Sequence, residues 1–297
     1  MIRVGRAGAE PLVRARRKRP AELLASRLTA LYETYDLRHL DPDPLVLVRR
    51  YPDPRDQEIA GLVAAAFAYG GVETIVRDVA DLFARMDCEP YGFVMRFVPK
   101  RDVPRLRGWY HRLHRGEDAA RLVGALRWAL EEFGSLAALF SSGFEPQHRD
   151  VGRALAIFVQ RLREHSPDVG EASPYYLHLL SSPTDGSACK RMNLFLRWMV
   201  RRSAPDLGLW KHIPPSHLVI PLDTHVARIA RYIGLTGRRT ADWRMARQVT
   251  DSLRAIDAED PVKFDYAICR LGILEACPQR RDRAACSSCP LEEICDL

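Results

Sequence analysis

Four of the seven cysteines in this 297-residue sequence lie close together near its end, at Cys277, Cys286, Cys289 and Cys295. Clustered thiolates bind soft metals, so this spacing indicates either an iron–sulfur cluster or zinc. Structural zinc usually takes two short-spaced pairs of ligands, whereas only Cys286 and Cys289 form such a pair here. We therefore predict a [4Fe–4S] cluster held by these four thiolates, with zinc as the alternative.

The number of cysteines and the apolar pattern of the sequence indicate the cell compartment. An odd number of cysteines, crowded at one end, is not typical of a secreted disulfide protein. No uninterrupted apolar run follows the basic N-terminal residues, and the most apolar stretch, residues 59–72, is too short to cross a bilayer. We expect a cytoplasmic protein, at the bacterial nucleoid, that does not enter a membrane. Three cysteines are expected to pack as small apolar side chains: Cys88, Cys189 and Cys269.

The cysteine segment resembles a known loop. From Cys286 to Cys295 the sequence reads Cys-Ser-Ser-Cys-Pro-Leu-Glu-Glu-Ile-Cys, which resembles the iron–sulfur loop that closes endonuclease-III-type and adenine-mismatch DNA glycosylases. The interval before Cys286 is longer than in those enzymes. The resemblance implies a structural cluster and a loop that helps to hold the DNA backbone. Three arginines lie inside the long interval and are candidates for phosphate contacts: Arg280, Arg281 and Arg283.

A second candidate is Asp223, which directly precedes an apolar stripe at helical spacing. An aspartate at this place caps a helix, and capping alone would explain it. However, the string Leu-Asp-Thr-His-Val-Ala-Arg-Ile that begins at Leu222 resembles the segment with the catalytic aspartate in the helix-hairpin-helix glycosylase superfamily. The resemblance implies that Asp223 stabilises positive charge on a sugar while an N-glycosidic bond breaks. His225 is expected to make a structural hydrogen bond.

That superfamily carries a glycine-rich hairpin before its aspartate, and this sequence departs from the pattern. The nearest match is residues 183–193, where Gly186 and Ser187 could present backbone N–H groups to a phosphate. Lys190 and Arg191 follow. In bifunctional members a hairpin lysine forms a Schiff base with the sugar, so Lys190 is a candidate for that role or for a phosphate contact. Residues 201–217 are interpreted as an insertion.

Residues 64–71 form a small-residue stretch that ends in an aromatic residue and two glycines. The stretch lies where glycosylases place a wedge that fills the gap left by the extruded base. Tyr69 is the candidate wedge, although a core tyrosine at a helix end is the simpler interpretation. From about residue 20 to the end, the chain is most similar to an uncharacterised bacterial branch of the superfamily.

The elements that must position these residues are helices. Apolar residues recur at helical spacing, and no convincing run of alternating strands is present. We therefore predict an all-α fold, and the resemblance implies a two-lobed, glycosylase-like arrangement. The predicted helices cover residues 23–35, 59–69, 119–133, 155–162, 194–200, 226–233 and 262–274. The predicted organisation is a disordered basic arm (1–20) and a helical domain (21–297), which includes a family-specific insertion (88–150) and the iron–sulfur loop (277–297).

The charge distribution is uneven. Of a formal net charge of +7, residues 1–20 contribute about +6, as expected for an arm that contacts a polyanion or for a solvated tail. Residues 93–115 mix aromatic and basic side chains. The aromatic rings could stack on nucleic-acid bases, or they could face the protein core.

Together these observations predict a monomeric DNA N-glycosylase, with or without lyase activity. This hydrolase would excise an altered base flipped from double-stranded DNA that contains a damaged or mispaired base. The alternative is a non-catalytic iron–sulfur protein that binds DNA or RNA on the same scaffold.

Overall fold

The computed structural model describes residues 20–169, 173–274, 277–278 and 280–297. Helices dominate this part of the chain, which confirms the all-α prediction. The α-helices are α1 (Ala21–Thr34), α2 (Leu45–Val48), α3 (Pro54–Ala66), α4 (Val72–Arg85), α5 (Pro90–Met95), α6 (Pro99–Leu106), α7 (Gly116–Phe133), α8 (Leu136–Ser141), α9 (Gly152–Glu164), α10 (Tyr176–Leu179), α11 (Lys190–Val200), α12 (Thr224–Tyr232), α13 (Trp243–Arg254), α14 (Asp265–Ile273) and α15 (Arg283–Ser287).

Short elements connect these helices. The 3₁₀ helices are η1 (Leu37–His39), η2 (Pro183–Asp185), η3 (Pro215–His217), η4 (Pro261–Phe264) and η5 (Glu292–Ile294). Two short strands, β1 (Tyr110–His111) and β2 (His114–Arg115), form an antiparallel hairpin in which His111 lies opposite His114. No helix among those described is long and apolar enough to cross a membrane.

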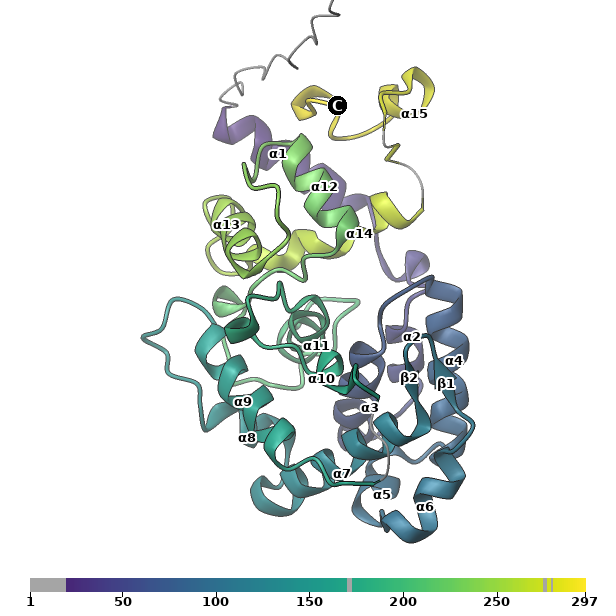
Figure 1. Ribbon diagram of the computed structural model, residues 1–297. Coiled ribbons are helices and arrows are strands. Elements are labelled where there is room, and N and C mark those ends of the chain that lie inside the picture. Colours follow the sequence, from purple (N-terminus) through teal and green to yellow (C-terminus); the bar gives the residue numbers. More distant parts are fainter. Residues whose placement is uncertain (1–19, 170–172, 275–276, 279) are drawn as a thin grey trace, which may run out of the picture.

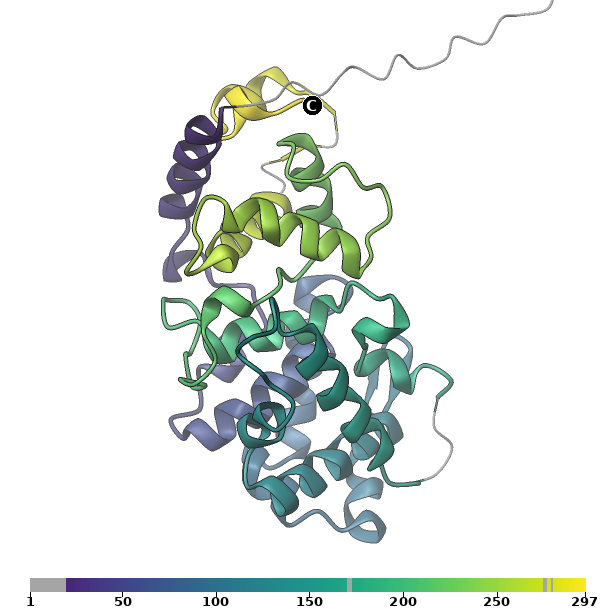
Figure 2. The ribbon, with the colours of Figure 1, turned by 90° about the vertical axis from the view of Figure 1, so that its left-hand side faces the viewer.

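The helices form two groups, one above the other in Figures 1 and 2. The chain begins in the upper group with α1, passes through α2 to α11 in the lower group, and returns to the upper group with α12 to α15. We call the upper set the terminal group and the lower set the central group. Helix α1 packs on α14, so the two ends of the described chain meet in the terminal group.

Helices α3 and α11 form the middle of the central group. All residues from 58 to 66 of α3 and from 192 to 200 of α11 are buried, as expected for helices that are covered on every side. Gly61 permits their close approach, because a Cβ at this position would lie 2.7 Å from the Cε atom of Met199. This pair carries residues of the candidate site at its ends.

Local signals explain where the important helices begin. Asp53 caps α3 by accepting a hydrogen bond from the N–H of Arg55, and Pro54 occupies the first helical position, where no N–H is needed. Asp223 caps α12 and Asp242 caps α13 in the same way. The predicted helices over 23–35, 59–69, 119–133, 155–162, 194–200, 226–233 and 262–274 are confirmed, within a few residues at their ends.

The mixed aromatic and basic segment turns most of its rings inward. Phe93, Phe97 and Trp109 are buried in the core, whereas Tyr110 is exposed. Of the two interpretations, the structural one therefore holds for three of the four aromatic side chains.

Candidate functional site

A cavity of about 640 Å³ lies between the central and terminal groups. The loop after α3, the first turns of α11 and α12, and one face of α14 line it. Asp223, Lys190 and Tyr69, which are far apart in the sequence, all belong to its lining. The fold thus brings the predicted carboxylate, amine and aromatic ring to a single cavity.

Asp223 is half-buried and both of its carboxylate oxygens have partners. Oδ1 accepts a hydrogen bond of 2.7 Å from the N–H of Val226, which confirms the predicted helix cap. Oδ2 accepts one of 3.4 Å from the thiol of Cys269 on α14. Burial, reinforced by the negative charge of Asp223, raises the pKa of this thiol well above its ordinary value, so Cys269 remains a donor. The aspartate is held in one orientation while it lines the cavity.

Lys190 and Arg191 begin α11 and donate to the end of α3. Lys190 Nζ lies 2.9 Å from the carbonyl oxygen of Ala68, and an Arg191 nitrogen lies 2.8 Å from that of Ala66. Cations are favourable at a helix C-terminus, where carbonyl groups lack partners. Burial lowers the pKa of Arg191 to about 10. Both side chains line the cavity rather than the outer surface.

The ring of Tyr69 lines the cavity, but its hydroxyl group is engaged elsewhere. The hydroxyl donates to the carbonyl oxygen of His111 at 3.1 Å and contacts the ring of His114. The guanidinium of Arg191 lies 5.1 Å from the centre of the tyrosine ring. These contacts fix the side chain at the rim, as expected for a structural tyrosine.

The segment that replaces the hairpin differs from the prediction. Gly186 has a left-handed conformation, with φ of 71°, and its N–H donates to the carbonyl oxygen of Pro183. This N–H is therefore not free for a phosphate, because it closes the turn of η2. Ser187 pairs with Asp242 in an isolated bridge, and its hydroxyl oxygen accepts from the N–H of Cys189. Gly186 and Ser187 are not part of the cavity lining.

His225 lines the cavity, and it does not make the expected structural hydrogen bond through Nδ1. This atom is buried and has no partner among the described residues. The ring is pressed against α14, since a Cβ at Gly272 would lie 2.5 Å from the Cβ of His225. Close packing, rather than hydrogen bonding, places this side chain.

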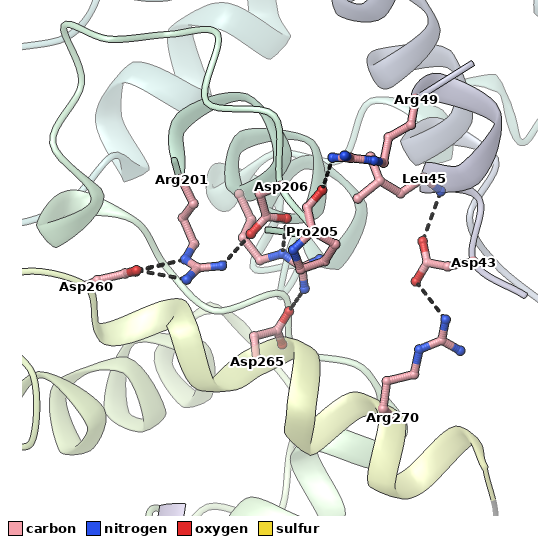
Figure 3. Close-up of polar contacts among 10 residues, drawn as sticks. Asp43, Leu45, Arg49, Arg201, Pro205, Asp206, Asp260, Asp265 and Arg270 are labelled. Carbon is pink, nitrogen blue, oxygen red and sulfur yellow. Dashed lines mark hydrogen bonds and ion pairs between the residues drawn. The ribbon is translucent and has the colours of Figure 1, made fainter. Parts of the chain in front are cut away.

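A buried network of ion pairs adjoins the cavity (Figure 3). This network was not predicted from the sequence. Arg197 Nε lies 3.1 Å from Asp206, and a second Arg197 nitrogen pairs with Asp265. Arg201 pairs with Asp206 and Asp260. Asp265 and Arg197 line the cavity, whereas Asp206 does not. Burial raises the pKa of Asp265 to about 7 although Arg197 opposes this shift.

A second pair, between Arg270 and Asp43, lies near this network. Arg270 Nη2 lies 3.9 Å from Asp43, and the guanidinium also donates to the carbonyl oxygens of Leu40 and Pro42. The signal in the sequence was the presence of Arg197 and Arg270 inside apolar helical segments, because a buried charge requires a partner.

The four cysteines of the C-terminal segment line one small hollow of about 30 Å³. All four are half-buried. Burial raises the pKa of Cys277 and Cys289, and the neighbouring thiols raise both further. Thiols are the donor type that soft metals and iron–sulfur clusters take. In the described ranges, no three His, Cys, Asp or Glu side chains are close enough to hold one metal ion.

Contacts with α1 and α12 attach this segment to the rest of the terminal group. Arg228 of α12 donates to the carbonyl oxygen of Cys277 at 3.0 Å, and Arg27 of α1 pairs with Glu293. The helix that Asp223 caps therefore also holds the cysteine segment.

A family model described as "Protein of unknown function (DUF2400)" matches residues 43–274. The chain belongs to this family. No curated protein matches the chain. The DUF2400 match contains the whole cavity lining, runs through residues 88–150, and ends just before Cys277.

Outside the DUF2400 match, Arg280, Arg281 and Arg283 are exposed on the cysteine segment. Arg281 lies 3.7 Å from Glu292. The basic arm lies outside the described residues, apart from Pro20.

The remaining cysteines divide into two kinds. Cys189 and Cys269 pack inside, as predicted, and burial raises the pKa of Cys189 to about 12. The prediction for Cys88 is wrong: its side chain is exposed. This residue has a positive φ of 54° in the turn after α4, so the turn directs it away from the core.

Proposed function

We propose that this protein is a DNA N-glycosylase that excises an altered base extruded from the duplex into the cavity between the two helix groups. The observation that carries the proposal is the shared cavity of Asp223 and Lys190. Its volume of about 640 Å³ lies within the ordinary range for small-molecule sites. An enzyme that acts on a base must take it out of the stack, and such a cavity could receive it. On this proposal the two helix groups are the lobes of a glycosylase-like fold.

Asp223 would act on the sugar. When the bond between C1′ and the base nitrogen breaks, the bonding electrons leave with the base and positive charge develops on the sugar ring. A fixed carboxylate beside that ring stabilises the charge without reorganising. The hydrogen bonds from Val226 and Cys269 supply this fixed orientation.

Lys190 would either bind the nucleotide or attack it. As a nucleophile, the amine of Lys190 would displace the base from C1′, and the ring oxygen would then leave C1′ as the imine forms. Loss of a C2′ proton would expel the 3′ phosphate. If water attacks instead, the product is an intact abasic site. Because Lys190 and Asp223 line the same cavity, either path is open, and the products distinguish them.

The cysteine segment would support the DNA backbone. A [4Fe–4S] cluster bound by Cys277, Cys286, Cys289 and Cys295, or zinc in the alternative, would supply a structural crosslink there. The exposed arginines Arg280, Arg281 and Arg283 would then contact phosphates from a rigid segment.

The test is a panel of duplex oligonucleotides, each with one damaged or mispaired base, incubated with the full-length protein. Alkali-labile sites at the altered base on at least one duplex are expected. The same preparation of an Asp223→Asn variant controls for contaminating enzymes. Binding to these duplexes without base release from any of them would contradict the proposal and support the non-catalytic iron–sulfur DNA- or RNA-binding protein instead.

A further inference from the structure

Exposed apolar side chains gather on two segments at the edge of the cavity, the hairpin of β1 and β2 and the start of α10. Among the described residues, the large apolar side chains that remain exposed include four on these segments: Tyr110 (59% exposed), Leu113 (46%), Tyr175 (39%) and Leu177 (54%). Single exposed apolar side chains are ordinary, whereas a group of them indicates a binding surface. We call residues 110–115 and 175–178 the rim surface.

Hydrogen bonds join the two segments to each other and to the cavity lining. Nε2 of His114 donates to the carbonyl oxygen of Tyr175 at 3.0 Å, which ties β2 to the residue before α10. Arg191, which lines the cavity, donates to the carbonyl oxygen of His178 in α10. The rim surface is therefore continuous with the cavity wall.

The hairpin turns basic and aromatic side chains outward together. Tyr110 lies opposite Arg115 in the two-stranded ladder, so both side chains leave the same exposed face. The stem of Arg112 crosses Gly70 in the cavity lining, where a Cβ would lie 2.8 Å from the Cδ atom of the arginine. The guanidinium of Arg112 lies 6.0 Å from the centre of the Tyr69 ring. This arginine thus lies directly at the edge of the cavity.

The arginines of the rim surface have no acidic counterpart there. Residues 103–116 and 173–184 contain no Asp or Glu. Within the described part of the chain, neither Arg112 nor Arg115 forms an ion pair. Unpaired cations beside exposed aromatic rings fit a nucleic-acid strand, because the cations pair with phosphates while the rings stack on bases. A strand that delivers a nucleotide into the cavity must also cross this rim.

We propose that the rim surface binds unpaired nucleotides next to the altered base, with base faces against the rings of Tyr110 and Tyr175 and phosphates at Arg112 and Arg115. Bases inside an intact duplex are covered by their neighbours, so an unpaired stretch offers the faces that these rings need. This inference rests on the proposed function and names its favoured substrate class. That class is DNA whose altered base borders an unpaired stretch, as at a bubble or a fork.

The experiment measures binding of the full-length protein to two fluorescein-labelled probes by fluorescence anisotropy. The probes are an oligothymidylate of about 20 nucleotides and a duplex of the same length, neither with an altered base. The wild type is expected to bind the single strand more tightly than the duplex at the same salt concentration. Tyr110→Ala combined with Tyr175→Ala should weaken single-strand binding about 25-fold, about fivefold for each ring, and change duplex binding less than about twofold.

Two further double variants serve as controls. Tyr110→Phe with Tyr175→Phe keeps both rings and should bind the single strand as the wild type does. Leu37→Ala with Val98→Ala removes two similarly exposed apolar side chains from η1 and from the residue before α6, and should leave both affinities unchanged.

Three results would overturn the inference: a wild type that binds the duplex as tightly as the single strand, undiminished single-strand binding by the alanine variant, or an equal loss in the Leu37 and Val98 control. The wild-type comparison holds even if a variant does not fold. Neither probe reports on base release. A damaged-base panel without base release would therefore refute the glycosylase and leave the single-strand preference unaffected.

Discussion

Replacing Arg197 by methionine tests whether the buried network supports the cavity. The arginine side chain is 3% exposed, and its two partners, Asp206 and Asp265, are equally buried. The methionine keeps much of the volume but removes the hydrogen bonds to both carboxylates. Breaking a buried ion pair by removing one partner typically costs about 3–5 kcal/mol.

The structure places the expected cost at the lower end of that range. Asp206 keeps Arg201 as a partner, and Asp265 can take up a proton because burial already raises its pKa to about 7. We therefore expect Arg197→Met to lower the free energy of unfolding by about 3 kcal/mol at pH 8. The loss should be smaller at pH 5.5, where Asp265 is protonated in both proteins.

Thermal and urea unfolding followed by circular dichroism measure this effect. At pH 8 the expected decrease in Tm is about 5 °C. The double variant Arg197→Met with Asp265→Leu should recover most of the loss, because it removes the stranded carboxylate together with its partner. A loss below about 1 kcal/mol at pH 8, or an equal loss at both pH values, would refute the reasoning.

Three further predictions concern the site. Cys289→Ala should lose the bound metal and the visible absorption of an iron–sulfur cluster, measured by iron and zinc analysis, whereas the exposed Cys88→Ala should keep both. Asp265→Asn should become more stable relative to the wild type as pH rises from about 4 to 7, by about 1 kcal/mol per pH unit. Stability changes in this direction because the folded wild type binds a proton at Asp265 that the unfolded chain has released. Urea unfolding of both proteins at pH 5 and pH 7 measures the change. Lys190→Gln should abolish any covalent adduct trapped by borohydride on abasic DNA, and an undiminished adduct would exclude this amine.

The helices could be predicted because their signals are local. The periodicity of residues 226–233 and the cap at Asp223 predict α12 without any knowledge of its neighbours. Amphipathic helices such as α4 and α13 carried the same signal and were overlooked. The short hairpin of β1 and β2 has only two residues in each strand, too few for an alternating pattern.

The candidate site could be predicted only in part. Motif spacing identified Asp223 and Lys190, but the sequence does not show that Lys190 donates to the end of α3, which depends on packing between α11 and α3. The role of Asp265 depends on Arg197, 68 residues away. Such long-range partners follow from tertiary structure, so no local pattern could have paired them.

The rate of base release by Asp223→Asn under single-turnover conditions tests the central claim most directly. Asparagine caps helices as well as aspartate does, so α12 and DNA affinity should be preserved. Asp53→Asn, at the cap of α3 outside the cavity lining, is the matched control. On a duplex that the wild type cleaves, we predict a rate about 1,000-fold lower for Asp223→Asn and unchanged for Asp53→Asn. Base release by Asp223→Asn within about threefold of the wild-type rate would contradict the account.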